Sequence, residues 1–202
     1  MLDAAESLAL ELGGVRFVTV AAVTERAGLH RTGVRRYYAN KEELLLELAE
    51  RGWGGDGATR SKARLALGKG WSQLKWPRSS LKPSSPFRFF CDLLTHVTLS
   101  LEGDVEMERA RRYKTNAFAI HDNIVVALVQ ASRMTTEQIQ NLLATTLMLA
   151  AGFWQVSHPT PTLARLYEEV PEWAHVALDF GPRLRYLLRA MATGLAGSGS
   201  PA

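Results

Sequence analysis

A stretch of cationic and aromatic side chains without any carboxylate lies at residues 29–41, and the first acid beyond it is Glu42. An acid-free helix suits a position against DNA, because each carboxylate there would face a phosphate. Arginine can also donate two hydrogen bonds to the edge of a guanine. The residues that would carry this chemistry are Arg31, Arg35, Arg36, Tyr37 and Lys41.

Smaller residues nearby extend this pattern. His30 and Thr32 can contact bases or phosphates, and Gly33 permits a close approach of the backbone. Thr19 precedes a short apolar pattern, so its hydroxyl can cap a helix, and the N–H groups at that helix start can bind a phosphate oxygen. We therefore predict a nucleic-acid interface formed by Thr19 and residues 30–41.

Local signals predict the elements that must position these side chains. Apolar residues recur at helical spacing over 2–12, where a glycine pair ends the pattern. A second helix is expected between Thr19 and Gly28, a short polar helix over 30–37, and a further helix capped by Asn40. A helix, a tight turn with glycine and a short polar helix together predict a helix-turn-helix.

The second half of the chain also reads as helical, and no segment predicts a strand. Thr135 with Gln138 predicts a capping box at the start of a long apolar helix. The expected helices lie at 87–101, 105–131 (one helix or two), 135–156 and 182–195. The expected fold is all-α, with a helix-turn-helix domain at 1–48, a basic connector at 49–86, a helical effector-binding and dimerisation domain at 87–196, and a disordered tail at 197–202.

The connector differs in composition from its surroundings. Residues 57–91 carry eight basic side chains and no acid, whereas the rest of the chain has more acids than bases. Its apolar residues form no good stripe, so it reads either as a weak helix plus a loop or as a poorly ordered segment. Two origins stay open, a divergent basic linker and a coding segment read out of frame.

Several function classes are disfavoured. The lone Cys91 excludes an internal disulfide and a cysteine-based zinc cluster. On one helix Cys91 and His96 would point about 140° apart, a poor nucleophile–base pair. No metal, cofactor or enzyme activity is therefore expected. The acidic N-terminus and the absence of a 20-residue apolar run predict a cytoplasmic protein without a membrane span.

The motif "TVAAVTERAGLHRTGVRRYYANKEELL" at 19–45 resembles the TetR family of transcriptional repressors. The shared features are the Ala27-Gly28 turn and the spacing of Tyr38, Lys41 and Leu44 after it, in a match that covers about residues 1–48. Further along, "FCDLLTHVTLSLEG" and "WQVSHPTPTLARLYEEVPEW" are similar to one subgroup of these regulators. This chain has Arg35 where the family usually has tyrosine.

The resemblance implies a homodimer that binds double-stranded DNA at a palindromic operator, with two recognition helices about 34 Å apart. It implies that Thr19 contacts phosphate, that residues 30–36 form the recognition helix, and that Tyr37 and Lys41 hold the backbone. The helices at 135–156 and 182–195 are the expected dimer contacts. The alternative for these two is a pair of core helices in a monomer.

The family usually binds a small-molecule effector in its C-terminal domain. An apolar or amphipathic effector would meet a mainly apolar site with few polar groups. The candidate ligand residues are Phe90, Leu94, Phe118, His121, Met148 and Trp154. For each of them, packing in the core is the alternative role. The alternative for the whole chain is a helical small-molecule-binding or scaffold protein without regulated DNA binding.

Overall fold

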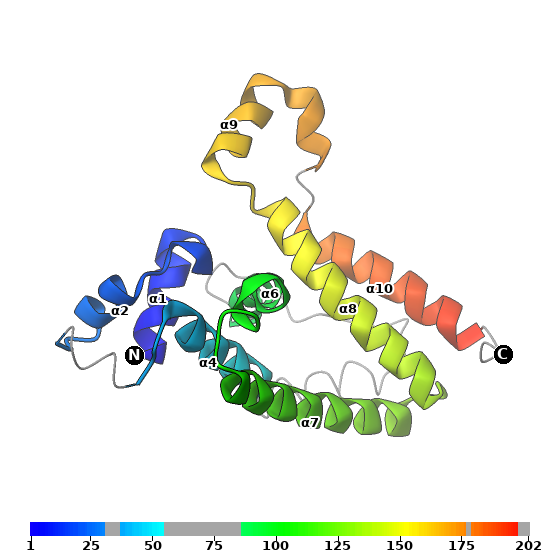
Figure 1. Cartoon of the computed structure of the whole chain (residues 1–202). Coiled ribbons are helices and arrows are strands. Elements are labelled where there is room, and N and C mark those ends of the chain that lie inside the picture. Colours follow the sequence, from blue (N-terminus) through cyan, green and yellow to red (C-terminus); the bar gives the residue numbers. More distant parts are fainter. Residues whose placement is uncertain (31–36, 55–85, 177–178, 198–202) are drawn as a thin grey trace. The chain divides into compact units, whose positions relative to one another are not determined.

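The computed structural model describes residues 1–30, 37–54, 86–176 and 179–197, and the regular structure in these ranges is entirely helical (Figure 1). The expected all-α fold is therefore confirmed. The elements are α1 (Leu2–Leu12), η1 (Val15–Phe17), α2 (Val20–Arg26), α4 (Lys41–Gly54), α6 (Pro86–His96), η4 (Val97–Leu101), α7 (Met107–Ala131), α8 (Thr136–Ser157), α9 (Pro161–Glu169), η5 (Pro171–Val176) and α10 (Phe180–Gly197).

The described residues divide into two compact units. The first contains the described residues of 1–54 together with 86–122, and the second contains 123–176 together with 179–197. The division falls within α7. The predicted residues 31–36, most of the connector and the end of the tail lie outside the described residues.

Helix starts and ends follow the local signals in the sequence. Gly13 ends α1 in the left-handed conformation, with φ at 79°, which glycine adopts at little cost. The hydroxyl of Thr19 accepts from the backbone N–H of Ala22 and caps α2. Thr135 and Gln138 form the predicted capping box at the start of α8. These predictions are confirmed.

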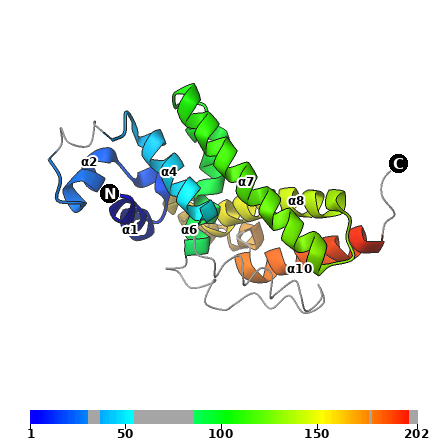
Figure 2. The ribbon, with the colours of Figure 1, turned by 90° about the horizontal axis from the view of Figure 1, so that it is seen from below.

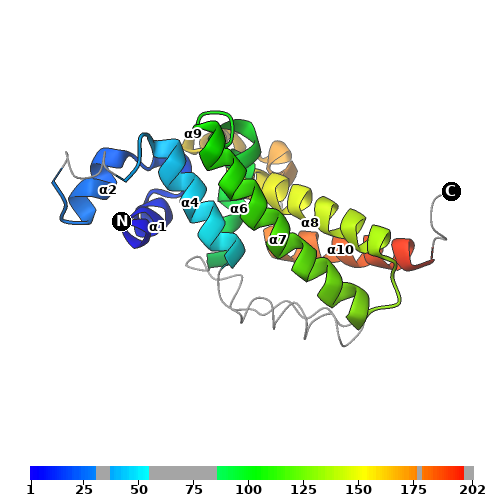
Figure 3. The same cartoon turned by 60° about the horizontal axis from the view of Figure 1, so that its bottom comes forward.

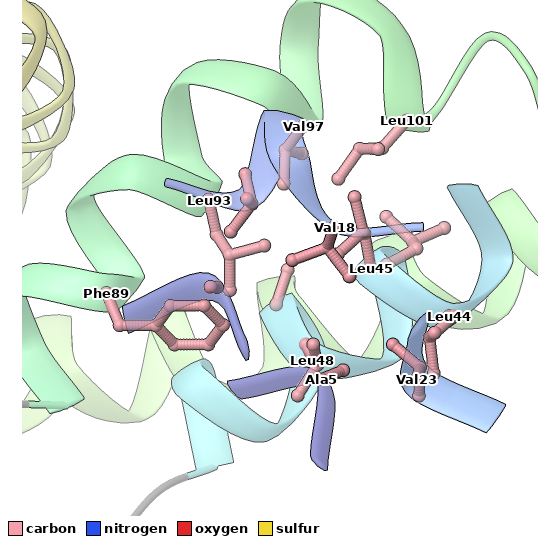
Figure 4. Packing of buried hydrophobic residues seen from close by; sticks show 14 of the residues in the cluster. Ala5, Val18, Val23, Leu44, Leu45, Leu48, Phe89, Leu93, Val97 and Leu101 are labelled. Atoms are coloured by element: carbon pink, nitrogen blue, oxygen red, sulfur yellow. The ribbon is translucent and has the colours of Figure 1, made fainter. Parts of the chain in front are cut away.

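The core of the first unit lies where α6 and η4 meet α1, η1 and α4 (Figure 4). Phe89, Leu93, Val97 and Leu101 recur every four residues and all contribute to this core. In a regular α-helix a strict four-residue repeat drifts around the helix, because one turn holds 3.6 residues. The π-helical turn of η4, in which the N–H of Glu102 bonds to the carbonyl of Val97, offsets that drift.

In the second unit, α8 and α10 lie side by side (Figure 1, Figure 2 and Figure 3). Ile139 and Leu142 of α8 are buried in one cluster with Ala192 of α10. The side-chain amide of Gln138 donates to the carbonyl of Leu195 at 2.6 Å, which ties the start of α8 to the end of α10. The last helix begins at Phe180, two residues before the expected start.

The sequence did not indicate α9 or η5. A break was expected at 158–161; α8 ends at Ser157, and residues 158–160 separate it from the next helix, which begins at Pro161. A new helix begins at once, because the hydroxyl of Thr160 caps it by accepting from Leu163 and Pro161 occupies its first turn. No residue of α9 is buried.

Candidate nucleic-acid interface

The segment that leads into α2 is fixed by a buried polar contact. Val15 and Val18 of this segment are completely buried. The carboxylate Oδ2 of Asp92, on α6, accepts a 2.7 Å hydrogen bond from the backbone N–H of Val15. Because Asp92 is itself only 5% exposed, water does not compete for this bond. The α1–α2 connection is thus held by α6.

Thr19 lies at the exposed start of α2. Its hydroxyl oxygen accepts from Ala22 at 3.2 Å, so the hydroxyl proton remains to be donated. The first N–H groups of a helix and its partial positive charge favour an anion. This geometry suits the predicted contact with a phosphate.

Gly28 makes the turn that follows α2. Its φ of 64° is left-handed, a conformation that favours glycine. The N–H of Gly28 donates to Glu25 and the N–H of Leu29 to Thr24, which satisfies carbonyl groups at the helix end. The turn directs the chain into exposed His30. The next predicted contacts, Arg31, Thr32, Gly33, Arg35 and Arg36, lie outside the described residues.

The predicted contacts on the other side of that gap differ in exposure. Tyr37 is 73% exposed and is available to a partner. Lys41 is half-buried, and its ammonium donates to the carbonyl of Arg16 at 2.9 Å. Burial lowers the pKa of Lys41, an effect that Glu42 partly offsets. Lys41 therefore also has a structural contact, which the sequence did not indicate.

The start of α4 is held by local capping hydrogen bonds and by one hydrogen bond to a residue distant in sequence. Asn40 accepts from the N–H of Glu43 at 2.9 Å, and the carboxylate of Glu43 accepts from the N–H of Ala39 at 2.7 Å. The predicted cap is confirmed. The side-chain amide of Asn40 also donates to the carbonyl of Asp104 at 2.8 Å. This bond links the start of α4 to the turn between η4 and α7.

An ion pair joins α1 to α2 on the surface. The guanidinium of Arg26 donates to both carboxylate oxygens of Glu11 at 2.7 Å. Hydrogen bonds from Arg26 and from Ser7 lower the pKa of Glu11 to about 2. A two-point contact fixes orientation better than a single bond. It therefore orients α2 relative to α1.

The predicted ligand residues of the first unit do not share one environment. Phe90 meets the ring of Trp53 edge-to-face at 5.3 Å, and Leu94 is half-buried. Phe118 is 60% exposed, with the Lys114 ammonium 5.8 Å from its ring centroid. His121 lies 3.3 Å from the carboxylate of the exposed Asp122.

The other two ligand candidates belong to the second unit. Met148 is 75% exposed. Trp154 stacks on His158 at 3.7 Å between ring centroids and meets Phe180 edge-to-face at 5.5 Å. The first turns of α7 border a groove whose lining residues all lie between Glu108 and Asn116. None of the six candidates lines this groove. Their role in effector binding stays a prediction.

The described residues contain no group of three or more His, Cys, Asp or Glu side chains placed to hold a metal ion. None of their helices combines the length and the apolar character needed to cross a lipid bilayer.

Comparison with known proteins decides the family. Residues 88–198 match the family described as tetracyclin repressor-like, C-terminal domain, which is more than half of the chain. The chain belongs to the TetR family. This match lies outside residues 19–45, whose sequence resembles the same family. No curated protein matches the chain.

In this TetR family protein, the matched C-terminal domain contains Asp92 but not Val15, to which Asp92 is hydrogen-bonded. Sequence reasoning missed the contact between them. Asp92 follows the helical pattern of α6 without any motif, and its partner is a backbone group 77 residues away. Only the tertiary packing brings the two together.

Proposed function

We propose that this TetR family protein is a homodimeric repressor that binds a palindromic operator and releases it when a small apolar or amphipathic molecule binds. The observation that carries the DNA-binding part is the capped, exposed start of α2 at Thr19. It is followed by the Gly28 turn and then by the acid-free sequence from His30 to Lys41. This arrangement supports placing a cationic helix against DNA.

The dimer is supported by exposed stripes on both long helices of the second unit. On α8, Met148, Gly152 and Val156 recur every four residues and are exposed. On α10, Tyr186, Ala190 and Gly194 do the same. Small residues let two helices approach closely, and the space beside Gly152 and Gly194 is open. We assign these stripes to the contact between protomers.

Release by an effector needs a route from the C-terminal domain to the DNA-binding helices. The helix α6 contacts η1 and α4 within the first unit, and most of α6 belongs to the family match. An effector that shifts α6 would therefore move the segment before Thr19. Such an effector would bind more tightly to the conformation that does not bind DNA. It would therefore lower the affinity for DNA, and bound DNA would lower the affinity for the effector by the same factor.

The test compares variants in binding to DNA from beside the chain's own gene, followed by fluorescence anisotropy. Thr19→Val removes a helix cap and a predicted phosphate contact, whereas Thr160→Val removes only the equivalent cap of α9. We expect Thr19→Val to weaken DNA binding by about 1 kcal/mol or more beyond Thr160→Val. Arg36→Ala should cost about 1–3 kcal/mol if Arg36 contacts a guanine. Equal binding by all three variants contradicts the proposal.

A further inference from the structure

A groove of about 340 Å³ follows the first turns of α7 in the first unit. Three of its six lining residues are arginines, and the other three are Glu108, Thr115 and Asn116. The groove contains none of the predicted DNA-contacting or effector-contacting residues. Its composition points to a negatively charged ligand, because guanidinium groups bind carboxylate and phosphate in paired hydrogen bonds.

The decisive residue of this groove is Arg109. Its side chain is only 9% exposed. Its Nη2 lies 3.1 Å from the carboxylate of Glu50 in an ion pair, and neither Nη1 nor Nη2 forms a hydrogen bond among the described residues. Buried polar groups are almost always hydrogen-bonded. Arg109 therefore has two donors that a bound acceptor would satisfy.

Two of the three arginines that line the groove form ion pairs with acids. Arg111 pairs with Glu108 at 3.3 Å, and Arg109 pairs with Glu50. Arg112 is exposed and makes no ion pair within the part of the chain that the structure describes. The lining residues therefore carry three cations and one acid, and Glu50, which pairs with Arg109, comes from α4.

Tyr38, which is close enough to interact with Arg109 and Arg112, supplies no negative charge to the groove. Burial and the nearby Glu47 raise the pKa of Tyr38 to about 12, although Arg109 and Arg112 act in the opposite direction. Tyr38 is thus a neutral phenol at physiological pH.

We propose that this groove binds an oxyanion, the phosphate or carboxylate group of a small molecule, between Arg109 and Arg112. The hydroxyl of Thr115 is a further donor on the same helix face. Both terminal nitrogens of Arg109 are covered by protein atoms, so binding in this proposal requires the guanidinium to turn toward the groove. Its ion pair with Glu50 is given up in exchange.

A regulatory consequence rests on the proposed operator binding. Glu50 lies on α4, and α4 begins at Lys41, a predicted phosphate contact. An anion that separates Arg109 from Glu50 loosens the attachment of α7 to α4. The binding test below contains no DNA, so its failure is distinguishable from failure of the proposed function.

The probe is inorganic phosphate, titrated against the full-length chain while thermal unfolding is followed by circular dichroism. Sodium chloride at equal ionic strength is the reference, and acetate is a second probe that identifies a preference for carboxylate. A ligand that binds only the folded chain raises its unfolding temperature in a saturable way. We expect one of the two oxyanions to do so and chloride not to.

Three variants decide whether the groove is responsible. Arg112→Gln removes the exposed cation, and Arg133→Gln removes an exposed cation of the second unit as a matched control. Arg109→Lys keeps the buried charge but loses the paired donors. We expect the oxyanion to bind Arg112→Gln and Arg109→Lys about tenfold or more weakly, and Arg133→Gln like the parent chain. An equal response by Arg112→Gln, or no response beyond that to chloride, overturns the proposal.

Discussion

The Oδ2 atom of Asp92 accepts a 2.7 Å hydrogen bond from the backbone N–H of Val15, although 77 positions separate the two residues. Both residues are buried. The bond joins the first helix of the C-terminal family match to the short segment between α1 and α2. Val15 lies four residues before the helix cap Thr19. The contact therefore connects the domain expected to bind an effector with the helix expected to meet DNA.

Replacing Asp92 by Ala should lower the free energy of unfolding by about 1–3 kcal/mol, because the buried Val15 N–H loses its acceptor. Urea denaturation measures this change. Asp92→Asn is the control, since its side-chain oxygen still accepts the bond, and it should retain most of the stability. If Asp92→Ala unfolds at the same urea concentration as the parent chain, the bond does not hold the segment in place.

A second prediction concerns Gly52, on the last turn of α4. A Cβ at this position would lie 2.4 Å from Cδ2 of Phe90. In an open helix Gly→Ala stabilises by about 1 kcal/mol, but here overpacking should reverse the sign and destabilise by about 1–3 kcal/mol. A double-mutant cycle with Phe90→Ala checks the cause. If Gly52→Ala destabilises the Phe90→Ala background equally, the contact with Phe90 is not the reason.

The ion pair between Glu11 and Arg26 predicts a pH dependence. The pKa of Glu11 is about 2 in the folded chain and ordinarily 4.5, so the contact stabilises the fold above pH 4.5 and is lost as the pH falls through 2. The stability difference between the parent chain and Glu11→Gln should therefore shrink over this interval. NMR titration should also find the Glu11 pKa closer to 4.5 in Arg26→Gln. An unchanged pKa in that variant contradicts the assignment to Arg26.

The dimer proposal is tested on the exposed stripe of α8. Because Met148 is 75% exposed, Met148→Glu should leave the single chain folded while placing a charge in the contact between protomers. We expect the dissociation constant to rise about tenfold or more, measured by sedimentation. Gln140→Glu, about 80° away around the helix, should have little effect. A Met148→Glu variant that dimerises like the parent chain would place the interface elsewhere.

Local signals predicted much of this fold because they act between residues close in sequence. Thr19, Asn40 and Thr135 cap helices through backbone groups three residues ahead. The bond of Asp92 to Val15, the contact of Gly52 with Phe90 and the groove along α7 depend on tertiary neighbours, and no short motif encodes them.

In the candidate interface, too, the sequence predicted local features but not a tertiary contact. The motif at 19–45 predicted Thr19 and Tyr37 as accessible contacts, and both are exposed in the structure. It gave no sign that the ammonium of Lys41 donates to the carbonyl of Arg16. That bond joins residues 25 positions apart, so it depends on tertiary packing rather than on local sequence.

The most direct test of the central claim is binding of the purified chain to DNA from beside its own gene, titrated with salt and with random-sequence competitor. A specific dimeric repressor should keep a saturable, competitor-resistant complex at physiological salt, with two protomers for each site. Binding that vanishes equally with any competitor would contradict operator recognition. It would favour a helical scaffold whose basic surface holds DNA only through its phosphates.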